Sequence, residues 1–162
     1  PTGRAAKRMS EATGEEARTI HRLLEYGGDE DTFARSEDYP LEADCIIVDE
    51  CQFLTVEQID QLRSIVDEHN IPVMCFGLRT DFLTNLFPGS RRLFEVADSI
   101  TEIKTICKCG KKAIVNARID GEGRVLTRGG QILLGGNDSY VAMCHSCWKM
   151  AIAEQENNLE DK

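Results

Sequence analysis

Several features are missing from this sequence, and each absence excludes a class of protein. No apolar run approaches the roughly 18 residues that a membrane-spanning helix needs. The N-terminal residues PTGRAAKRMS contain no apolar core of the kind that a secretion signal carries, which indicates a cytoplasmic protein. Acidic residues outnumber basic ones by 28 to 19, and the net charge of -9 argues against non-specific binding to nucleic acid or anionic membranes.

The remaining composition is that of a globular domain. A hydrophobic content of 41% and a charged content of 29% are ordinary, and 162 residues suffice for one domain with a small appendage. The seven cysteines need a separate explanation. Cytosolic cysteines seldom form lasting disulfides, so clustered ones indicate metal binding or reactivity.

The middle of the chain has the pattern of an α/β fold. CIIVDE and IPVMCFGL are continuous apolar runs, which favour strands of a parallel sheet that is covered on both faces. Between them TVEQIDQLRSIVDEHN predicts a helix that opens with a capping box, Thr55 with Gln58. Strand, helix and strand form a βαβ unit, and we assign residues 43–103 to a partial α/β nucleotide-binding core.

The flanking segments differ from this core. Residues 1–42 predict a helical segment followed by a linker, with a second capping box, Thr13 with Glu16, opening a helix in TGEEARTIHRLLEY. Residues 104–148 contain short strand-like runs separated by glycine turns and predict a small β-rich module. Residues 149–162 form a polar tail that we expect to fray.

Two close cysteine pairs frame the β-rich module. CKCG contributes Cys107 and Cys109, and CHSC contributes Cys144 and Cys147. Paired cysteines at both ends of a module are typical of a tetrahedral zinc site that staples a segment with little core of its own. Four ordinary cysteines are the alternative, and His145 could replace one ligand. Four protein ligands leave no open position, so such a zinc ion would be structural.

Two acids, Asp49 and Glu50, end the first strand of the core. Such acids can hold magnesium, polarise water or take a proton from a substrate hydroxyl, and alone they do not distinguish hydrolysis from phosphate transfer. Solvated acids that cap the strand are the alternative. The phosphate-binding loop G-x-x-x-x-G-K-[ST] that usually precedes such a strand is absent from residues 1–44.

Five stretches carry a resemblance to a known family. In chain order they are VDECQFL, IPVMCFGLRTDF, LFPGSRRLFEVADSI, IKTICKCGKKAIVNARID and GGNDSYVAMC, and they span nearly all of residues 46–148. They resemble the thymidine kinases that carry a zinc-bound lasso. The resemblance implies ATP- and magnesium-dependent phosphorylation of the thymidine 5'-hydroxyl to dTMP. It also implies a P-loop-NTPase-like parallel sheet, here truncated at the front, a zinc-binding lasso domain and a homotetramer.

The same resemblance implies roles for individual residues. Glu50 would be the general base, and Asp49 would lie on the magnesium and phosphate side. Cys51 and Gln52 would complete this nucleotide corner. The thymidine-binding set comprises two aromatic residues, a lasso segment and a tyrosine: Phe82, Phe87, Gln131, Ile132, Leu133, Leu134, Gly135 and Tyr140. The cysteines of the two pairs match the family's zinc positions.

From composition alone, purely structural roles remain open for the aromatic residues. Phe82 and Phe87 could be core residues, and Tyr140 could serve packing first.

Residues 1–26 resemble a different family. PTGRAAKRMSE and TIHRLLEY are similar to the stretch downstream of the phosphate loop in RecD-type DNA helicases, and the two resemblances meet at a strand ending in VDE. The chain therefore has the pattern of a hybrid, with a helicase fragment as the rival interpretation. A non-catalytic, zinc-stapled nucleoside-binding module is a further alternative. Because no phosphate loop is present, we predict that the chain alone does not turn over thymidine.

Overall fold

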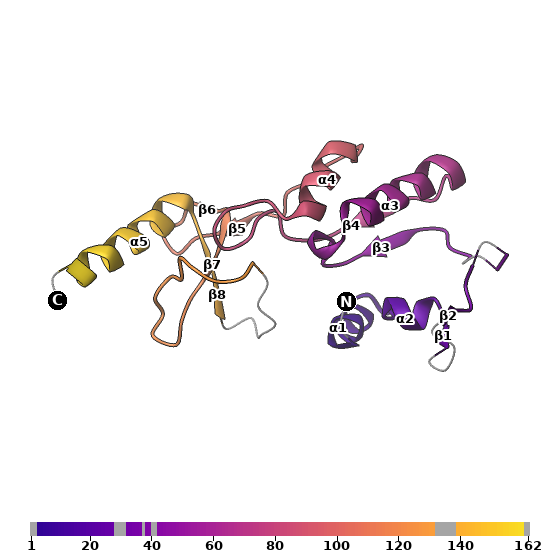
Figure 1. Cartoon of the computed structure of the whole chain (residues 1–162), viewed down its shortest axis with the longest axis horizontal. Helices are drawn as coiled ribbons and strands as arrows, with labels where there is room; N and C mark the ends of the chain where they lie inside the picture. Colours follow the sequence, from indigo (N-terminus) through magenta and orange to yellow (C-terminus); the bar gives the residue numbers. More distant parts are fainter. Residues whose placement is uncertain (1–2, 28–31, 37, 40–41, 132–138, 161–162) are drawn as a thin grey trace. The chain divides into compact units, whose positions relative to one another are not determined.

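The computed structural model describes residues 3–27, 32–36, 38–39, 42–131 and 139–160 (Figure 1). The chain divides into two compact units. The first unit comprises Pro1–Glu50 and Leu62–Phe76, and the second comprises Cys51–Gln61 and Gly77–Lys162. These two units do not test the predicted domains, which comprise residues 1–42, 43–103, 104–148 and 149–162. That division stays a prediction. Among the described residues, no helix combines the length and apolarity that crossing a bilayer requires.

The first unit is built around a two-stranded parallel sheet. Its elements are α1 (Gly3–Thr13), α2 (Ile20–Leu23), β1 (Tyr26–Gly27), β2 (Thr32–Phe33), β3 (Ile46–Val48), β4 (Val73–Cys75) and the second half of α3 (Val56–His69). β3 pairs with β4 in parallel, and β1 pairs with β2 in antiparallel. The predicted βαβ unit is therefore confirmed.

The predicted covering of this sheet on both faces is wrong for the described residues. Ile47 and Met74 face each other in register, yet they are 51% and 45% exposed. Alternate residues of a strand point to opposite faces, so the exposed pair marks one uncovered face. The described part of this sheet has only two strands, so it offers little area for covering helices.

The predicted helix opening at Thr13 is also wrong, because α1 ends there. Gly14 adopts a φ of 77°, a left-handed conformation that favours glycine and terminates helices, and its N–H donates to the Ser10 carbonyl at 3.0 Å. The Thr13 hydroxyl donates to the Met9 carbonyl at 2.8 Å, so it bonds back to the helix that precedes it.

The capping box of α3 is confirmed. The Thr55 N–H donates to Oε1 of Gln58 at 3.0 Å, and the Gln58 N–H donates to the Thr55 hydroxyl at 3.3 Å. The reciprocal bonds satisfy two donors that the start of a helix otherwise leaves without partners.

The second unit combines short helices with antiparallel strand pairs. Its elements are the 3-10 turn η1 (Cys51–Phe53), α4 (Pro88–Val96), β5 (Thr105–Ile106), β6 (Lys112–Ala113), β7 (Val115–Arg118), β8 (Tyr140–Met143) and α5 (His145–Glu160), with the first half of α3. β5 pairs with β6, and β7 pairs with β8. The β-rich character predicted for residues 104–148 is confirmed.

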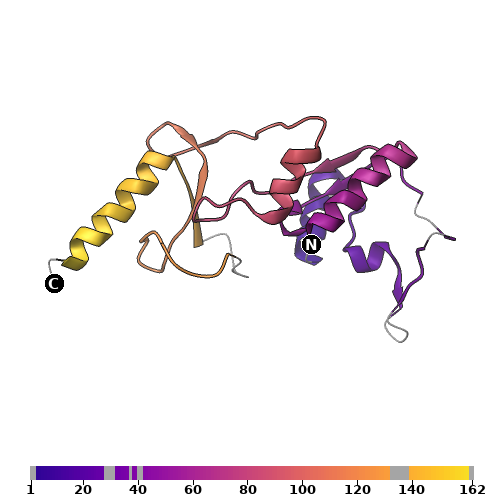
Figure 2. The same cartoon turned by 45° about the horizontal axis from the view of Figure 1, so that its top comes forward.

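The described part of the tail is helical, because α5 (His145–Glu160) runs through it (Figures 1 and 2), and its expected fraying stays a prediction. No glycine or proline follows Met150 to stop the helix, and Trp148, Ala151 and Ile152 pack on the core of the second unit.

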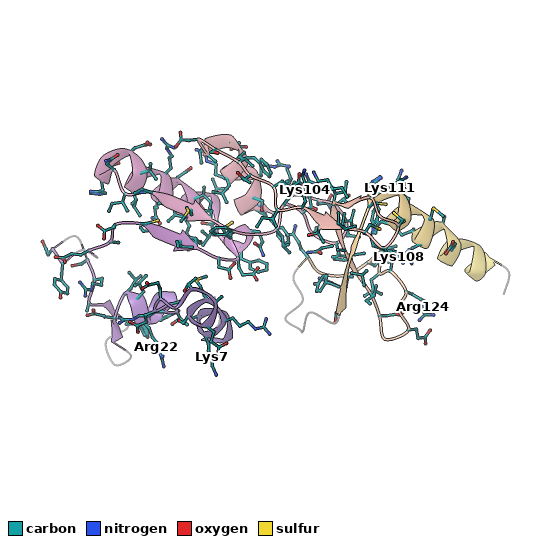
Figure 3. The ribbon with its side chains drawn as sticks, turned by 180° about the vertical axis from the view of Figure 1, so that it is seen from behind. Lys7, Arg22, Lys104, Lys108, Lys111 and Arg124 are labelled. Carbon is teal, nitrogen blue, oxygen red and sulfur yellow. The ribbon has the colours of Figure 1, made fainter. Side chains whose placement is uncertain are left out.

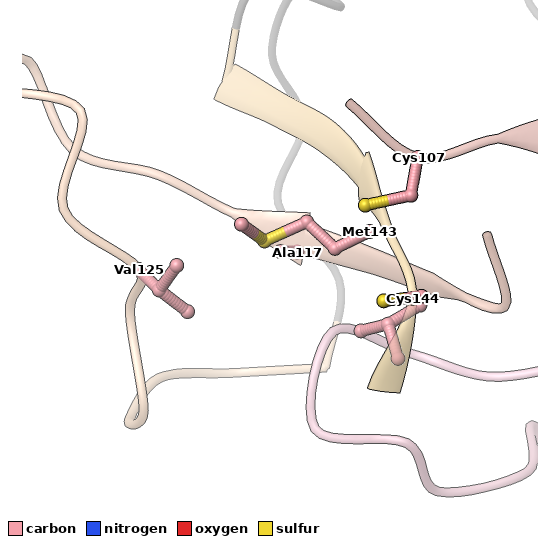
Figure 4. Close-up of a cluster of buried hydrophobic side chains, with 6 residues drawn as sticks. Cys107, Ala117, Val125, Met143 and Cys144 are labelled. Carbon is pink, nitrogen blue, oxygen red and sulfur yellow. The ribbon is translucent and has the colours of Figure 1, made fainter. Parts of the chain in front are cut away.

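This core contains two of the four paired cysteines. The buried members are Cys107, Val115, Ala117, Val125, Met143 and Cys144 (Figure 4). A cluster this small supplies little hydrophobic stabilisation on its own, which is the situation in which a metal staple contributes most.

Candidate functional site

The four paired cysteines meet at one place. Cys107 and Cys109 lie in the turn between β5 and β6, Cys144 directly follows β8, and Cys147 lies in the first turn of α5. Their four Sγ atoms all lie within 4.8 Å of one another, and the sulfurs of Cys109 and Cys144 are 3.6 Å apart. Tetrahedral zinc with Zn–S bonds of about 2.3 Å separates its sulfurs by about 3.8 Å. The residues present therefore fit a zinc ion after small adjustments.

The helix start favours a charged sulfur at Cys144. Its Sγ accepts the Cys147 N–H at 3.4 Å, and this bond lowers the pKa of the Cys144 thiol. The positive end of the helix dipole acts in the same direction. His145 lies outside the group of metal-ligating side chains found among the described residues, and its ring packs against Trp148 at 5.6 Å.

The pKa values of Cys107 and Cys147 are shifted in opposite directions. Backbone N–H groups, first that of Cys109 and then that of Cys144, lower the pKa of Cys107 to about 6. Hydrogen bonds to the sulfurs of Cys109 and Cys144 raise the pKa of Cys147 to about 12. Four adjacent thiolates repel one another, so full ionisation needs a bound metal. The exposed Lys104, Lys108 and Lys111 belong to the same hairpin region and add positive charge (Figure 3).

A second cluster surrounds the guanidinium group of Arg118, a residue that the sequence analysis did not single out. Arg118 is only 4% exposed and lies 4.0 Å above the ring of Phe82, which is 2% exposed. Arg118 pairs with Tyr140 across the β7–β8 ladder, and its Nε and Nη2 donate to the Tyr140 hydroxyl at 3.1 and 2.9 Å. Two predicted substrate-binding residues are thus held by one buried cation.

Gln131, the first residue of the predicted lasso segment, joins the same cluster. Its carbonyl accepts Nη2 of Arg118 at 3.3 Å, and its side-chain Nε2 donates to Oδ2 of Asp81 at 3.2 Å. Asp81 was likewise missed by the sequence analysis. Ile132, Leu133, Leu134 and Gly135 lie outside the described residues, so their predicted role stays a prediction.

Phe87 has a different environment. It is buried just before α4, where its ring meets that of Phe53 edge to face at 5.7 Å. This contact gives Phe87 a packing role, and its predicted contact with thymine stays a prediction.

The predicted nucleotide corner falls in two parts. Asp49 and Glu50 belong to the first unit and lie at the end of its first segment. Oδ1 of Asp49 accepts the Glu50 N–H at 2.9 Å, and Glu50 has a φ of 56°. A left-handed conformation at a glutamate stores strain, and such strain gathers at functional sites. Cys51 and Gln52 open the second unit and are buried.

Gln52 is used structurally. Its Oε1 accepts the Leu78 N–H at 3.0 Å, which ties η1 to the chain that follows Gly77. The Gly77 and Gly89 backbones approach η1 so closely that an added Cβ at either position would overlap it. The turn directly after the acid pair is therefore firmly packed.

Comparisons with known proteins identify the family of the chain. A family model described as "Thymidine kinase" matches residues 25–148. The chain belongs to the thymidine kinase family. The thymidine kinase of Yersinia pseudotuberculosis serotype I (strain IP32953) is 51% identical over 119 residues, which are 74% of this chain and 60% of the relative. The thymidine kinase of Legionella pneumophila (strain Philadelphia 1) is 54% identical over 110 residues, 68% of this chain and 53% of the relative.

A thymidine kinase of Idiomarina loihiensis is 51% identical over 109 residues, which are 67% of this chain and 56% of that relative. The chain thus spans little more than half the length of the curated thymidine kinases that it matches. Residues 1–24 precede the family match, and none of these relatives supports the helicase resemblance of residues 1–26.

Proposed function

We propose that the protein to which this chain belongs phosphorylates the 5'-hydroxyl of thymidine with ATP, in the cytoplasm, to supply dTMP. The observation that carries the proposal is the cluster of the buried Phe82 and Arg118 with the half-buried Tyr140, within a chain of this family. Arg118 covers one face of the Phe82 ring and holds the Tyr140 hydroxyl, so the proposal requires the base to stack on the opposite face of Phe82 with its sugar at the hydroxyl.

The residues at the end of β3 and in η1 would have separate roles in this reaction. Glu50 would accept the proton of the 5'-hydroxyl, and its neighbour Asp49 would lie towards the nucleotide phosphates. Magnesium, when bound, would offset the phosphate charge. Cys51 and Gln52 are buried and would support this corner through packing, since the Gln52 side-chain oxygen accepts the Leu78 N–H and so holds η1 in place.

The cysteine cluster has a structural part in this proposal. Zinc held by four thiolates would fix the turn between β5 and β6 to the start of α5. This linkage would stabilise β7 and β8, and those strands carry Arg118 and Tyr140. A P-loop-type sheet and a homotetramer, as in the resemblance, belong to the same proposal for the whole protein.

Zinc analysis combined with thymidine titration tests the proposal. We expect about one zinc ion per chain and saturable binding of thymidine by the 162-residue chain, measured by calorimetry. Thymidine binding without turnover in a version of the chain that is extended by a phosphate-binding loop would instead support a non-catalytic nucleoside-binding module. Tight binding of single-stranded DNA would support the helicase resemblance of residues 1–26.

A further inference from the structure

Asp81 is a buried carboxylate whose two oxygens bond different segments of the chain. It is 5% exposed, and its Oδ1 accepts the N–H groups of Leu83 and Asn85 at 2.9 and 2.8 Å. These bonds close the turn from Thr80 to Leu86, whose ends are joined by an antiparallel bridge. Phe82 lies within this turn, so Oδ1 fixes the backbone that presents the ring.

The second oxygen of Asp81 faces a segment fifty positions further along the chain. Oδ2 accepts Nε2 of Gln131 at 3.2 Å. Arg118 holds the adjacent backbone, because its Nη1 donates to the Gly130 carbonyl at 3.0 Å and its Nη2 to the Gln131 carbonyl. Gly129 lies so near that an added Cβ would be 3.4 Å from Nη1 of Arg118 and 3.9 Å from Cζ of Phe82.

We propose that Asp81 is a positioning residue that locks Gln131 against the turn carrying Phe82, and so sets the thymidine affinity of the site. The proposal rests on the proposed function, because Phe82 and Gln131 are its predicted nucleoside contacts. Asp81 acts through these two residues and does not itself touch the nucleoside.

The geometry distinguishes this role from ordinary turn closure. Asp120 closes another turn in the same way: its Oδ1 accepts the N–H groups of Glu122 and Arg124, both at 2.9 Å. Its Oδ2 accepts Nε of Arg124 at 2.8 Å, so both of its oxygens serve a single turn. Only the Asp81 carboxylate, of these two, joins separate segments of the candidate site, and Asp120 is therefore a matched control.

The test exchanges donor and acceptor across the Asp81–Gln131 bond. Asp81→Asn keeps an oxygen for the turn amides but sets an NH₂ group against the NH₂ of Gln131. Gln131→Glu sets two carboxylates against each other. The double variant restores one donor and one acceptor with the roles reversed and the net charge unchanged. Asp120→Asn is the control, and all are made in the 162-residue chain.

Two measurements are made on each variant: thymidine affinity by calorimetry and stability by urea unfolding. We expect each single substitution at Asp81 or Gln131 to weaken thymidine binding about tenfold, as the loss of a charge-assisted bond does. The double variant should return to within about threefold of wild type, and Asp120→Asn should stay within about twofold.

Equal affinities for Asp81→Asn and wild type would overturn the proposal, as would a double variant no better than either single one. Recovery of stability without recovery of affinity would also overturn it, because the bond would then be structural only. Absence of thymidine binding by the wild-type chain would refute the proposed function instead. The non-additivity of the unfolding free energies would then still decide whether the Asp81–Gln131 lock exists.

Discussion

Substituting Gly89 by alanine should destabilise the second unit through a single methyl group. A Cβ at Gly89 would lie 2.6 Å from the Leu54 carbonyl oxygen, 2.8 Å from that of Cys51 and 3.1 Å from that of Gln52. These three carbonyls belong to the main chain in and after η1, so they cannot turn aside as a long side chain would. Either α4 must move away from η1 or the turn must distort.

The expected magnitude follows from two opposing effects. Overpacking a tight contact costs about 1–3 kcal/mol, whereas alanine gains up to about 1 kcal/mol over glycine inside a helix. Gly89 lies in the first turn of α4, where the helical gain is incomplete. We therefore expect Gly89→Ala to lower the free energy of unfolding by about 1–2 kcal/mol.

Urea unfolding followed by tryptophan fluorescence measures this effect. Trp148 is the single tryptophan and packs on the core of the second unit, which also contains η1 and α4. Gly121→Ala is the control, because no atom lies within 4 Å of its added Cβ and its φ is not in the left-handed region. A Gly89→Ala variant as stable as wild type or Gly121→Ala would refute the packing argument.

Three further predictions concern the metal, the reaction and the buried cation. Cys107→Ser and Cys144→Ser should each release zinc and make the second unit sensitive to protease; unchanged metal content in both variants would remove the zinc site. The 162-residue chain should bind thymidine without phosphorylating it, and turnover at the rate of full-length thymidine kinases in a radiolabel assay would contradict this. Arg118→Lys should weaken thymidine binding about tenfold, because one ammonium group cannot bond Tyr140 and Gly130 as the guanidinium does; calorimetry showing wild-type affinity would remove Arg118 from the site.

The two threonine capping boxes show what local sequence can and cannot predict. Thr55 and Gln58 form the predicted reciprocal bonds, whereas Thr13 ends a helix instead of opening one. Both patterns have the same spacing of polar residues. The difference is Gly14, whose left-handed φ ends α1 at Thr13. At this position the helix-ending glycine outweighs the capping-box pattern.

The cysteine cluster was predictable because its pairs are local in sequence and their spacing reflects ligand geometry. Asp81 and Arg118 had no comparable signal. Their partners lie 50 and 22 positions away at Gln131 and Tyr140, so the fold had to be known before the pairing could be seen. A retrospective hint exists for Arg118, because a charge in the mostly apolar run AIVNARI needs buried hydrogen-bond partners.

The surroundings of Arg118 also indicate why the fold keeps a buried cation there. Among the described residues its hydrogen-bond acceptors are neutral: the Tyr140 hydroxyl and the Gly130 and Gln131 carbonyls. Burying a guanidinium is costly, and an apolar side chain of similar volume would often be as stable. What an apolar side chain could not do is fix the direction of the Tyr140 hydroxyl and the path of the chain at Gln131 together. Because Arg118 also covers the ring of Phe82, one cation orients three predicted nucleoside contacts, and stability alone does not explain that arrangement.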